Sequence, residues 1–593
     1  MRRLPRTGRW LPLALAALAA ALVYWSPALV FWEATGFGDW QQFQHQWEAA
    51  YVSVVRYGEL PLWNPWHCGG VILFGDPQAQ AYSPLFWLLL PFGTAAGLKI
   101  FLVLHTAFGW AGMVLFARRH LGVGPAASWA AALLWAGSGF FAWHGSGGHS
   151  AFLPFYFAPW LLLAWRKAAT DLRYAAAVAG IMALVLLEGG VYPFPYFCLL
   201  LAFDGVVQIA RAPDRAGRLA VFRAGAVALP LMLLLGGFRL VPVLNTMSRY
   251  PRPTAGDDAL SIPEVIAMLT SKEYDYGFPG HEYVWAEYGT FIGWIALALG
   301  LVGVVLAARR QRWVLAGFLL FGGLMLGRVT PFHPWALLHA LPVYGSLRVP
   351  SRFAVLMTFY LGLGAAIALQ AAVGWLARRR WRHDLDFLRG ALPWVLLLAI
   401  AGHLAWGNGA VIDRWRGPPL PPVDHDAEYH LISRHQYGAY ASFPARGVSN
   451  VGCYTGMTYP AAPGLWEGQR AQVRLRPGGE VHGVERTANT ITADVELSVP
   501  GDLVVNQTWA RGWSSDVGRV EQGDRGLIVV RGVPSGRRRV RLRYVPDDLA
   551  LASALGGTGL LATLFVAWWP SPARLRRRRR RARPPAAATS APG

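Results

Sequence analysis

The sequence predicts a polytopic α-helical membrane protein that carries a small β-domain before its last helix. Apolar residues make up 54% of the 593 positions and charged residues only 15%, a composition that excludes an ordinary soluble enzyme. Apolar runs of about twenty residues, each long enough to cross a bilayer, recur along the chain. About twelve runs qualify as transmembrane helices, and the dense Arg clusters between them all fall on one side.

Charge and the first apolar run predict the orientation. The formal net charge is +22, but Lys and Arg lie in short clusters between apolar runs, and we expect no nucleic-acid partner. The clusters predict a multi-pass protein of the bacterial plasma (inner) membrane with both termini cytoplasmic. The run at 11–32 is too long for a signal peptide and is expected to remain as the first helix. A basic cytoplasmic tail at 571–593 would contact anionic lipid of the bilayer.

The chain divides into a membrane domain and an outer domain. Residues 1–406 are expected to form the transmembrane domain, with two long outer loops at 33–84 and 245–288. Residues 407–546 differ in character and are expected to form an extracytoplasmic, mostly β domain. The final transmembrane helix, 547–570, then leads to the basic tail.

The second half of this outer domain has the pattern of β-strands. Apolar and polar residues alternate with a period of two, and a Pro-Gly turn follows. The apolar positions are Ile491, Ala493, Val495, Leu497 and Val499. Further short strands separated by glycine-rich turns predict a small β-sandwich outside the membrane.

The first predicted outer loop is the most polar stretch near the membrane. It carries carboxylates, imidazoles, glutamines and aromatic rings directly after an apolar helix, which predicts a site on the outer face. Asp39 is the candidate general base, because a positioned carboxylate can accept the proton of an attacking hydroxyl group. The alternative is that Asp39 only caps the helical segment that begins at Trp40.

Two further carboxylates follow in the same loop. Asp76 precedes a proline, where it either binds substrate or forms a turn. Glu48 belongs to a predicted helix at 40–57 whose apolar residues recur every three to four positions, which predicts a helix along the membrane interface. We therefore expect Glu48 on the solvated face and rank it as a weaker substrate-binding candidate than Asp76.

No metal or cofactor site is indicated by the spacing of potential ligands. His45 and His67 occur without an HxxxH or HExxH pattern and are expected to be structural. The three cysteines contain no CxxC pair, which argues against a zinc knuckle and leaves one Cys68–Cys453 bridge open. A divalent metal is compatible with the expected chemistry, but no residue is assigned to it. No glycine-rich loop for a nucleotide phosphate is found in the sequence.

Positive charge is scarce in the predicted outer loops, which makes two arginines informative. Arg348 and Arg352 lie four residues apart before a predicted span and can share one phosphate through charge-assisted hydrogen bonds. Snorkelling at a helix end is the alternative. Lys272 and Tyr276 lie in an outer loop whose rings and carboxylates suit a sugar, although an aromatic belt has the same composition.

Four segments resemble the YfhO-type bacterial membrane proteins within the GT-C class of polytopic glycosyltransferases. They are Gly38-Asp39, GELPLWNP at 58–65 with the glycines that follow, LRVPSRF at 347–353, and the β-domain segment 509–517. The resemblance covers nearly the whole chain. It implies transfer of a sugar from a polyprenyl-phosphate carrier, with an acidic residue of the first outer loop as the catalytic residue. Metal-dependent members often carry an acidic pair there, whereas Asp39 stands alone.

The leading hypothesis is a GT-C glycosyltransferase with Asp39 as base and a glycan or cell-envelope polymer as acceptor. A transporter or flippase of lipid-linked glycans is the competing class. It predicts half-sequence repeats and ionisable residues within the spans, and we find no such repeat. The third class is an envelope-assembly scaffold without catalysis, whose β-domain binds partners.

Overall fold

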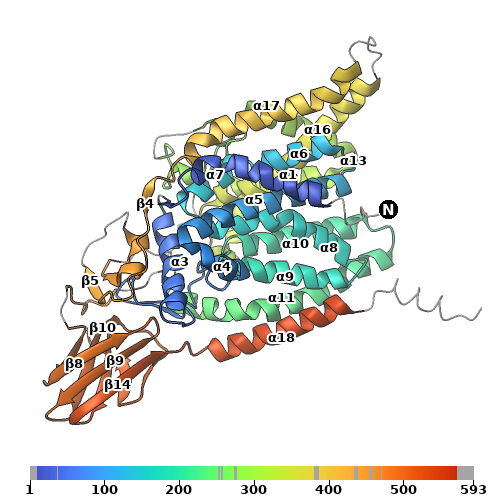
Figure 1. The fold of residues 1–593 in the computed structure, drawn as a ribbon. Helices are drawn as coiled ribbons and strands as arrows, with labels where there is room; N and C mark the ends of the chain where they lie inside the picture. Colours follow the sequence, from blue (N-terminus) through green and yellow to red (C-terminus); the bar gives the residue numbers. More distant parts are fainter. Residues whose placement is uncertain are drawn as a thin grey trace, which may run out of the picture.

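The computed structural model describes residues 10–36, 38–251, 254, 258–272, 277–378, 386–432, 439–452, 457, 459, 461–468 and 471–569. The predicted site residue Tyr276 and the predicted tail at 571–593 lie outside the described residues. Figure 1 shows a helical bundle with a β-domain at one end, from which the last helix, α18, returns along the bundle.

Seven helical segments among the described residues are long and apolar enough to cross a membrane. They are Pro84–His120 (α4, η2 and α5), Pro193–Arg211 (α10), Arg215–Arg249 (α11), Gly293–Arg310 (α13), Pro350–Arg378 (η6 and α16), Gly390–Ile412 (in α17, Asp386–Ile412) and Leu549–Trp568 (α18). Shorter apolar helices accompany them: α1 (Trp10–Tyr24), α9 (Arg173–Leu187) and α14 (Arg312–Met325). The chain is thus a polytopic membrane protein, and the total of about twelve spans stays a prediction.

The first helix is shorter than the apolar run at 11–32 predicts. α1 ends at Tyr24, and a separate short helix, α2 (Ser26–Leu29), has a proline in its first turn. Proline lacks a backbone N–H and clashes with the preceding helical turn, so it begins a helix rather than continuing one. Other short helices follow later in the chain: α6 (Pro125–Ala136), α7 (Gly139–Gly147), α8 (Ala158–Ala168), α12 (Ile262–Thr270) and α15 (Pro334–His339).

The first predicted outer loop folds into compact elements. β1 (Ala34–Thr35) pairs with β4 (Gly417–Pro419), and β2 (Trp63–Asn64) pairs with β3 (Val71–Ile72). Between these pairs lies the helix α3 (Trp40–Val55).

α3 lacks the solvated face that its apolar spacing predicts, and its expected position along the membrane interface stays a prediction. Thirteen of its sixteen residues are buried. The membrane helix α5 (Gly93–His120) and two short helical turns from the outer domain, η8 (Tyr440–Ser442) and η9 (Pro444–Arg446), pack against it. α3 is therefore an internal helix between the bundle and the outer domain.

The outer domain contains two four-stranded antiparallel sheets, in the orders β12-β13-β10-β7 and β11-β14-β9-β8. The strands are β7 (Val473–Arg476), β8 (Glu480–Arg486), β9 (Thr490–Leu497), β10 (Gly501–Thr508), β11 (Trp513–Ser515), β12 (Arg519–Gln522), β13 (Leu527–Val533) and β14 (Gly536–Tyr544). The alternating apolar residues of β9 lie in a core that both sheets share. Val499 is 48% exposed because the strand ends at Leu497. A separate parallel pair joins β5 (His430–Ile432) to β6 (Val448–Asn450).

Hydrogen bonds attach the outer domain to the first loop. Glu59 accepts the N–H of Asn489 at 2.9 Å and the hydroxyl of Thr487 at 2.8 Å, and Asn489 Oδ1 accepts the N–H of Trp63 at 3.0 Å. Cys68, which follows in this loop, is disulfide-bonded, and its partner lies outside the described residues. The GELPLWNP segment is therefore a docking segment for the sheet that contains β8 and β9.

The last helix returns the chain to the end of the bundle at which α1 begins. α18 packs along α11, and position 559 lies so close to the α11 backbone that a Cβ there would be 2.2 Å from the Leu235 nitrogen. Both ends of the described chain lie at the end of the bundle opposite to the β-domain (Figure 1). We call the end that carries the β-domain the outer end, following the predicted orientation.

Candidate active site

The segment after α7 packs directly against the start of α3 at the outer end. The Asp39 N–H donates to the carbonyl of Gly147 at 2.9 Å, and Gly148 follows with a φ of +103°. A Cβ at position 148 would lie 2.0 Å from the Trp40 nitrogen, so only glycine allows this approach of the two backbones. The contact places His149 beside Asp39.

Asp39, His149 and His144 form a hydrogen-bonded chain. His149 Nε2 lies 2.9 Å from Asp39 Oδ2, and His149 Nδ1 lies 2.6 Å from His144 Nδ1. A carboxylate only accepts, so it favours the tautomer of His149 with the hydrogen on Nε2 and leaves Nδ1 facing His144. The side chains of Asp39 and His149 are 31% and 16% exposed. Asp39 makes no side-chain capping bond to α3, contrary to the simple capping alternative.

A buried ion pair lies next to this chain. Glu287 comes from the short helical turn η4 (Trp285–Glu287), and Arg352 from η6 (Pro350–Phe353). Arg352 donates from Nε to Glu287 Oε2 at 2.8 Å and from Nη2 to Oε1 at 2.5 Å. Burial alone would raise the pKa of Glu287, but the charge and hydrogen bonds of the Arg352 guanidinium hold it well below its ordinary value. Glu287 is therefore an ionised carboxylate.

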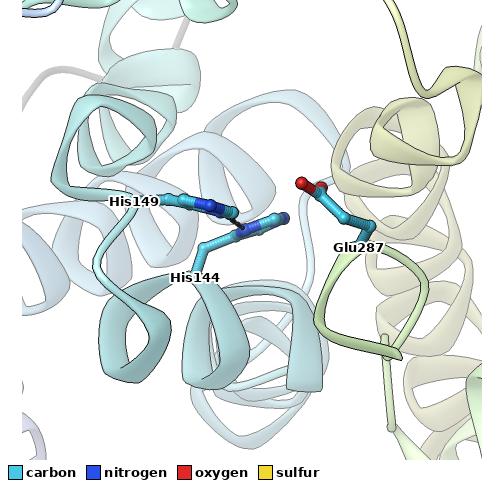
Figure 2. A group of neighbouring side chains, drawn as sticks. All are labelled: His144, His149 and Glu287. Carbon is cyan, nitrogen blue, oxygen red and sulfur yellow. Dashed lines mark hydrogen bonds between the residues drawn. The ribbon is translucent and has the colours of Figure 1, made fainter. Parts of the chain in front are cut away.

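His144, His149 and Glu287 bring three potential metal ligands together. Figure 2 shows the two imidazoles side by side and the Glu287 carboxylate facing them from a separate segment. Their ligand atoms lie within 4.8 Å of one another, and the part of the chain that the structure describes has one such group. Two imidazoles and a carboxylate suit zinc or another divalent transition metal.

The surroundings of this group also fit a cation. Burial, followed by the neighbouring His149, holds the pKa of His144 well below its ordinary value, so its ring is neutral and can offer a lone pair. Asp39 accepts from the Nε2 of His149, as carboxylates do when they orient a metal-binding histidine. The residues present therefore fit a divalent cation at a place where the sequence alone indicated none.

The predicted substrate residues lie at different places around α3. Asp76 is buried and accepts the N–H of Gln78 at 2.8 Å, which is the turn expected before Pro77. It also accepts from Gln46 Nε2 at 3.1 Å. Gln46 follows Asp39 by two helical turns, or about 10 Å along α3. Burial raises the pKa of Asp76 to about 6.

The predicted basic residues have separate partners. Arg352 pairs with Glu287, and its Nη1 is buried without a hydrogen-bond partner. The Arg348 guanidinium lies 5.6 Å from the centre of the Tyr283 ring, and Lys272 lies over the ring of Trp406 on α17. A phosphate shared by Arg348 and Arg352 stays a prediction.

The expected solvated position of Glu48 is wrong. Glu48 is 3% exposed and accepts the hydroxyl of Thr94 at 2.6 Å. Its face of α3 packs against the start of α5, so the charged form has no access to bulk water. Burial raises the pKa of Glu48 to about 7.

Sequence reasoning missed three members of the central group: His144, His149 and Glu287. The two histidines flank the short stretch Gly-Ser-Gly-Gly between two apolar runs. Glycines that permit close backbone approach, next to two imidazoles in a short outer turn, were the signal available in the sequence. Glu287 gave no comparable signal, because its partner Arg352 lies 65 positions later.

Comparison with known proteins places the fold. No protein-family model matches the chain, and no curated protein matches it. The chain is similar in structure to the arabinofuranosyltransferase AftD from mycobacteria, with 18% identity, a TM-score of 0.50, and coverage of 78% of this chain and 32% of AftD. The Archaeoglobus fulgidus oligosaccharyltransferase matches with 12% identity, a TM-score of 0.44 and coverage of 76% and 65%. The arabinosyltransferase EmbB from Mycobacterium smegmatis matches with 15% identity, a TM-score of 0.30 and coverage of 92% and 63%.

The likeness to AftD supports a shared fold and nothing narrower, because unrelated activities can occupy one fold. The expectation of a GT-C-like membrane fold agrees with it, and the YfhO-type resemblance stays a prediction. The chain spans about a third of the AftD chain and less than two thirds of the other two.

Proposed function

We propose that this protein is a membrane glycosyltransferase that moves a sugar from a polyprenyl-phosphate carrier to an extracytoplasmic glycan or cell-envelope polymer. The observation that carries the proposal is the group formed by Asp39, His149, His144, Glu287 and Arg352 at the outer end of an apolar bundle. A donor held by lipid would reach this end through the membrane. The sequence offers no nucleotide-binding glycine loop as another source.

Asp39 is the proposed general base. Its carboxylate is partly exposed, so an acceptor hydroxyl can reach it. The hydroxyl oxygen forms a bond to the anomeric carbon, its proton passes to Asp39, and the bond from the anomeric carbon to the phosphate oxygen breaks. Polyprenyl phosphate leaves with the electron pair of that bond. The hydrogen bond from His149 holds the Asp39 carboxylate in one orientation throughout.

His144, His149 and Glu287 are proposed to hold a divalent cation. When bound, such a cation supplies positive charge that stabilises phosphate oxygens. Arg352 keeps Glu287 ionised and in place through its two hydrogen bonds. Arg348, half-buried with an unpartnered Nε, is proposed to contact the donor phosphate.

The test is an Asp39→Asn variant, because asparagine keeps an oxygen acceptor for His149 but takes up no proton. We expect transfer from a polyprenyl-phosphate sugar to fall by about 10²–10⁴-fold with an unchanged unfolding temperature. Asp413→Asn is the matched control, since Asp413 pairs with Arg416 on the surface. Wild-type transfer by the purified, folded Asp39→Asn protein would show that the assignment of Asp39 is wrong.

A further inference from the structure

A cavity lies between the outer domain and the first loop, where Trp63 and Val71 meet Thr508 and Trp509. It has a volume of about 240 Å³. Its walls are rich in aromatic side chains: Trp63, Tyr250, Tyr459 and Trp509. We call it the aromatic cavity. The rings of Tyr250 and Tyr459 contact each other, with centroids 4.8 Å apart.

A small polar recess adjoins the aromatic cavity. The recess has a volume of about 10 Å³, and Val71, Ile72 and Tyr459 line both spaces. Gln42, Gln46 and Asp76 are among its other lining residues. A space of this size holds about one water molecule or one hydroxyl group.

Several polar atoms around the recess are buried and have no hydrogen-bond partner. They are Gln42 Nε2, Gln46 Oε1 and the Tyr459 hydroxyl, on side chains that are only 7%, 7% and 8% exposed. Leaving a buried donor or acceptor unsatisfied costs free energy, and such groups normally have a partner in the functional protein. A ligand that brings hydroxyl groups into the recess would satisfy both donors and acceptors.

The lining also indicates the charge of the ligand. No Lys or Arg lines either space among the described residues, and the one carboxyl group, Asp76, already accepts from Gln46 and Gln78. Neutral hydroxyl-rich rings combine an apolar face that stacks on aromatic side chains with an edge of hydrogen-bonding groups. Phosphate or an anionic headgroup would meet no Lys or Arg among the described residues that line these spaces.

We propose that the aromatic cavity and its polar recess bind a neutral sugar unit of the acceptor glycan. One ring would stack on the aromatic wall and place a hydroxyl group among Gln42, Gln46 and Tyr459. Gln42 and Gln46 lie one and two turns along α3 from Asp39, so a glycan held here would extend toward the proposed base. The identification of this sugar as part of the acceptor rests on the proposed function, whereas the presence of a sugar-binding site does not.

Binding of soluble oligosaccharides to the full-length protein in lipid nanodiscs tests the site without a donor. The probes are neutral arabino-, galacto-, gluco- and manno-oligosaccharides, and the readouts are saturation-transfer NMR and tryptophan fluorescence. At least one series is expected to bind at millimolar concentration. Tyr459→Phe and Gln42→Leu should each weaken binding about five-fold, the effect of one lost hydrogen bond. Trp509→Ala should weaken it about ten-fold through lost stacking.

Gln44→Leu is the matched control. Gln44 is a fully buried glutamine of the same helix with both amide atoms unpartnered, but it lines neither space. Its substitution should leave oligosaccharide binding unchanged, and thermal unfolding of each variant verifies the fold. Absence of binding by all four series, or binding that the three cavity variants leave unchanged, would overturn the inference. The Asp39→Asn protein should bind as the wild type does, so a failure of the proposed catalysis is distinguishable from a failure of this site.

Discussion

Position 148 shows how one residue can determine the candidate site. Its positive φ and the missing space for a Cβ both require glycine, and the contact sets the distance between Asp39 and His149. Gly148→Ala should destabilise the protein by at least about 2 kcal/mol and abolish most transfer activity. Gly147→Ala is the control, because a Cβ at position 147 meets no atom within 4 Å. Equal unfolding temperatures of the two variants would contradict this account.

Glu48 predicts a pH dependence of stability. Its pKa rises on folding from 4.5 to about 7 because the side chain is buried. The folded protein thus favours the protonated form, and this stabilisation, complete below about pH 4.5, is lost as the pH rises through 7. Glu48→Gln should be more stable than the wild type above about pH 8, by up to about 3 kcal/mol, and equal to it near pH 4.5. Chemical unfolding across this pH range measures the difference, and a constant difference at all pH values would refute it.

At the residue scale, the sequence could single out Asp39 but not its partners. A carboxylate directly after an apolar helix is visible in a linear pattern. His149 lies 110 positions away, and only the backbone contact at Gly148 brings it near. Burial of Glu48 was equally hidden, because Thr94 and the rest of α5 cover it from another part of the chain.

Two short helical turns, η4 and η6, position the ion pair of the site. Glu287→Gln removes the only carboxylate of the three-ligand group and leaves the buried Arg352 without its charge partner. We expect about 10–100-fold weaker metal binding and a loss of about 3–5 kcal/mol in stability. Mass spectrometry of the metal content in purified protein tests the weaker metal binding, with Glu521→Gln, which changes a partly exposed carboxylate of the outer domain, as control. Equal metal content in both variants would exclude Glu287 as a ligand.

At the scale of elements, a sequence pattern predicts the environment of a helix or strand well where a single face of that element is buried. The alternation in β9 predicted its buried face because both sheets cover that face in the way any sandwich does. The spacing in α3 predicted a helix but the wrong environment. Its polar residues are buried by η8 and η9, which come about 400 positions later in the chain. A local sequence pattern cannot indicate burial by such a distant segment.

The whole molecule depends on contact between its two parts, because the first loop and the outer domain together form the walls of the aromatic cavity. Glu59 joins the parts by accepting from Thr487 and Asn489. The sequence singled out its segment, GELPLWNP, only through a resemblance, since the docking partner is more than 400 positions away. Membrane spans could be predicted from the composition of the sequence, whereas the docking of the outer domain on the GELPLWNP segment could not.

Glu59→Ala should loosen the outer domain without unfolding either part. Loss of two hydrogen bonds to a carboxylate costs about 2–3 kcal/mol at this contact, so local opening should become easier while the sheets keep their shared core. Hydrogen exchange at residues 487–490 is expected to accelerate, and oligosaccharide binding in the aromatic cavity should weaken because Trp63 on its wall is held by Asn489. Glu485→Ala, which removes an exposed carboxylate 73% open to solvent on the same sheet, should change neither. Faster exchange with unaltered binding would mean that the cavity forms independently of this docking contact.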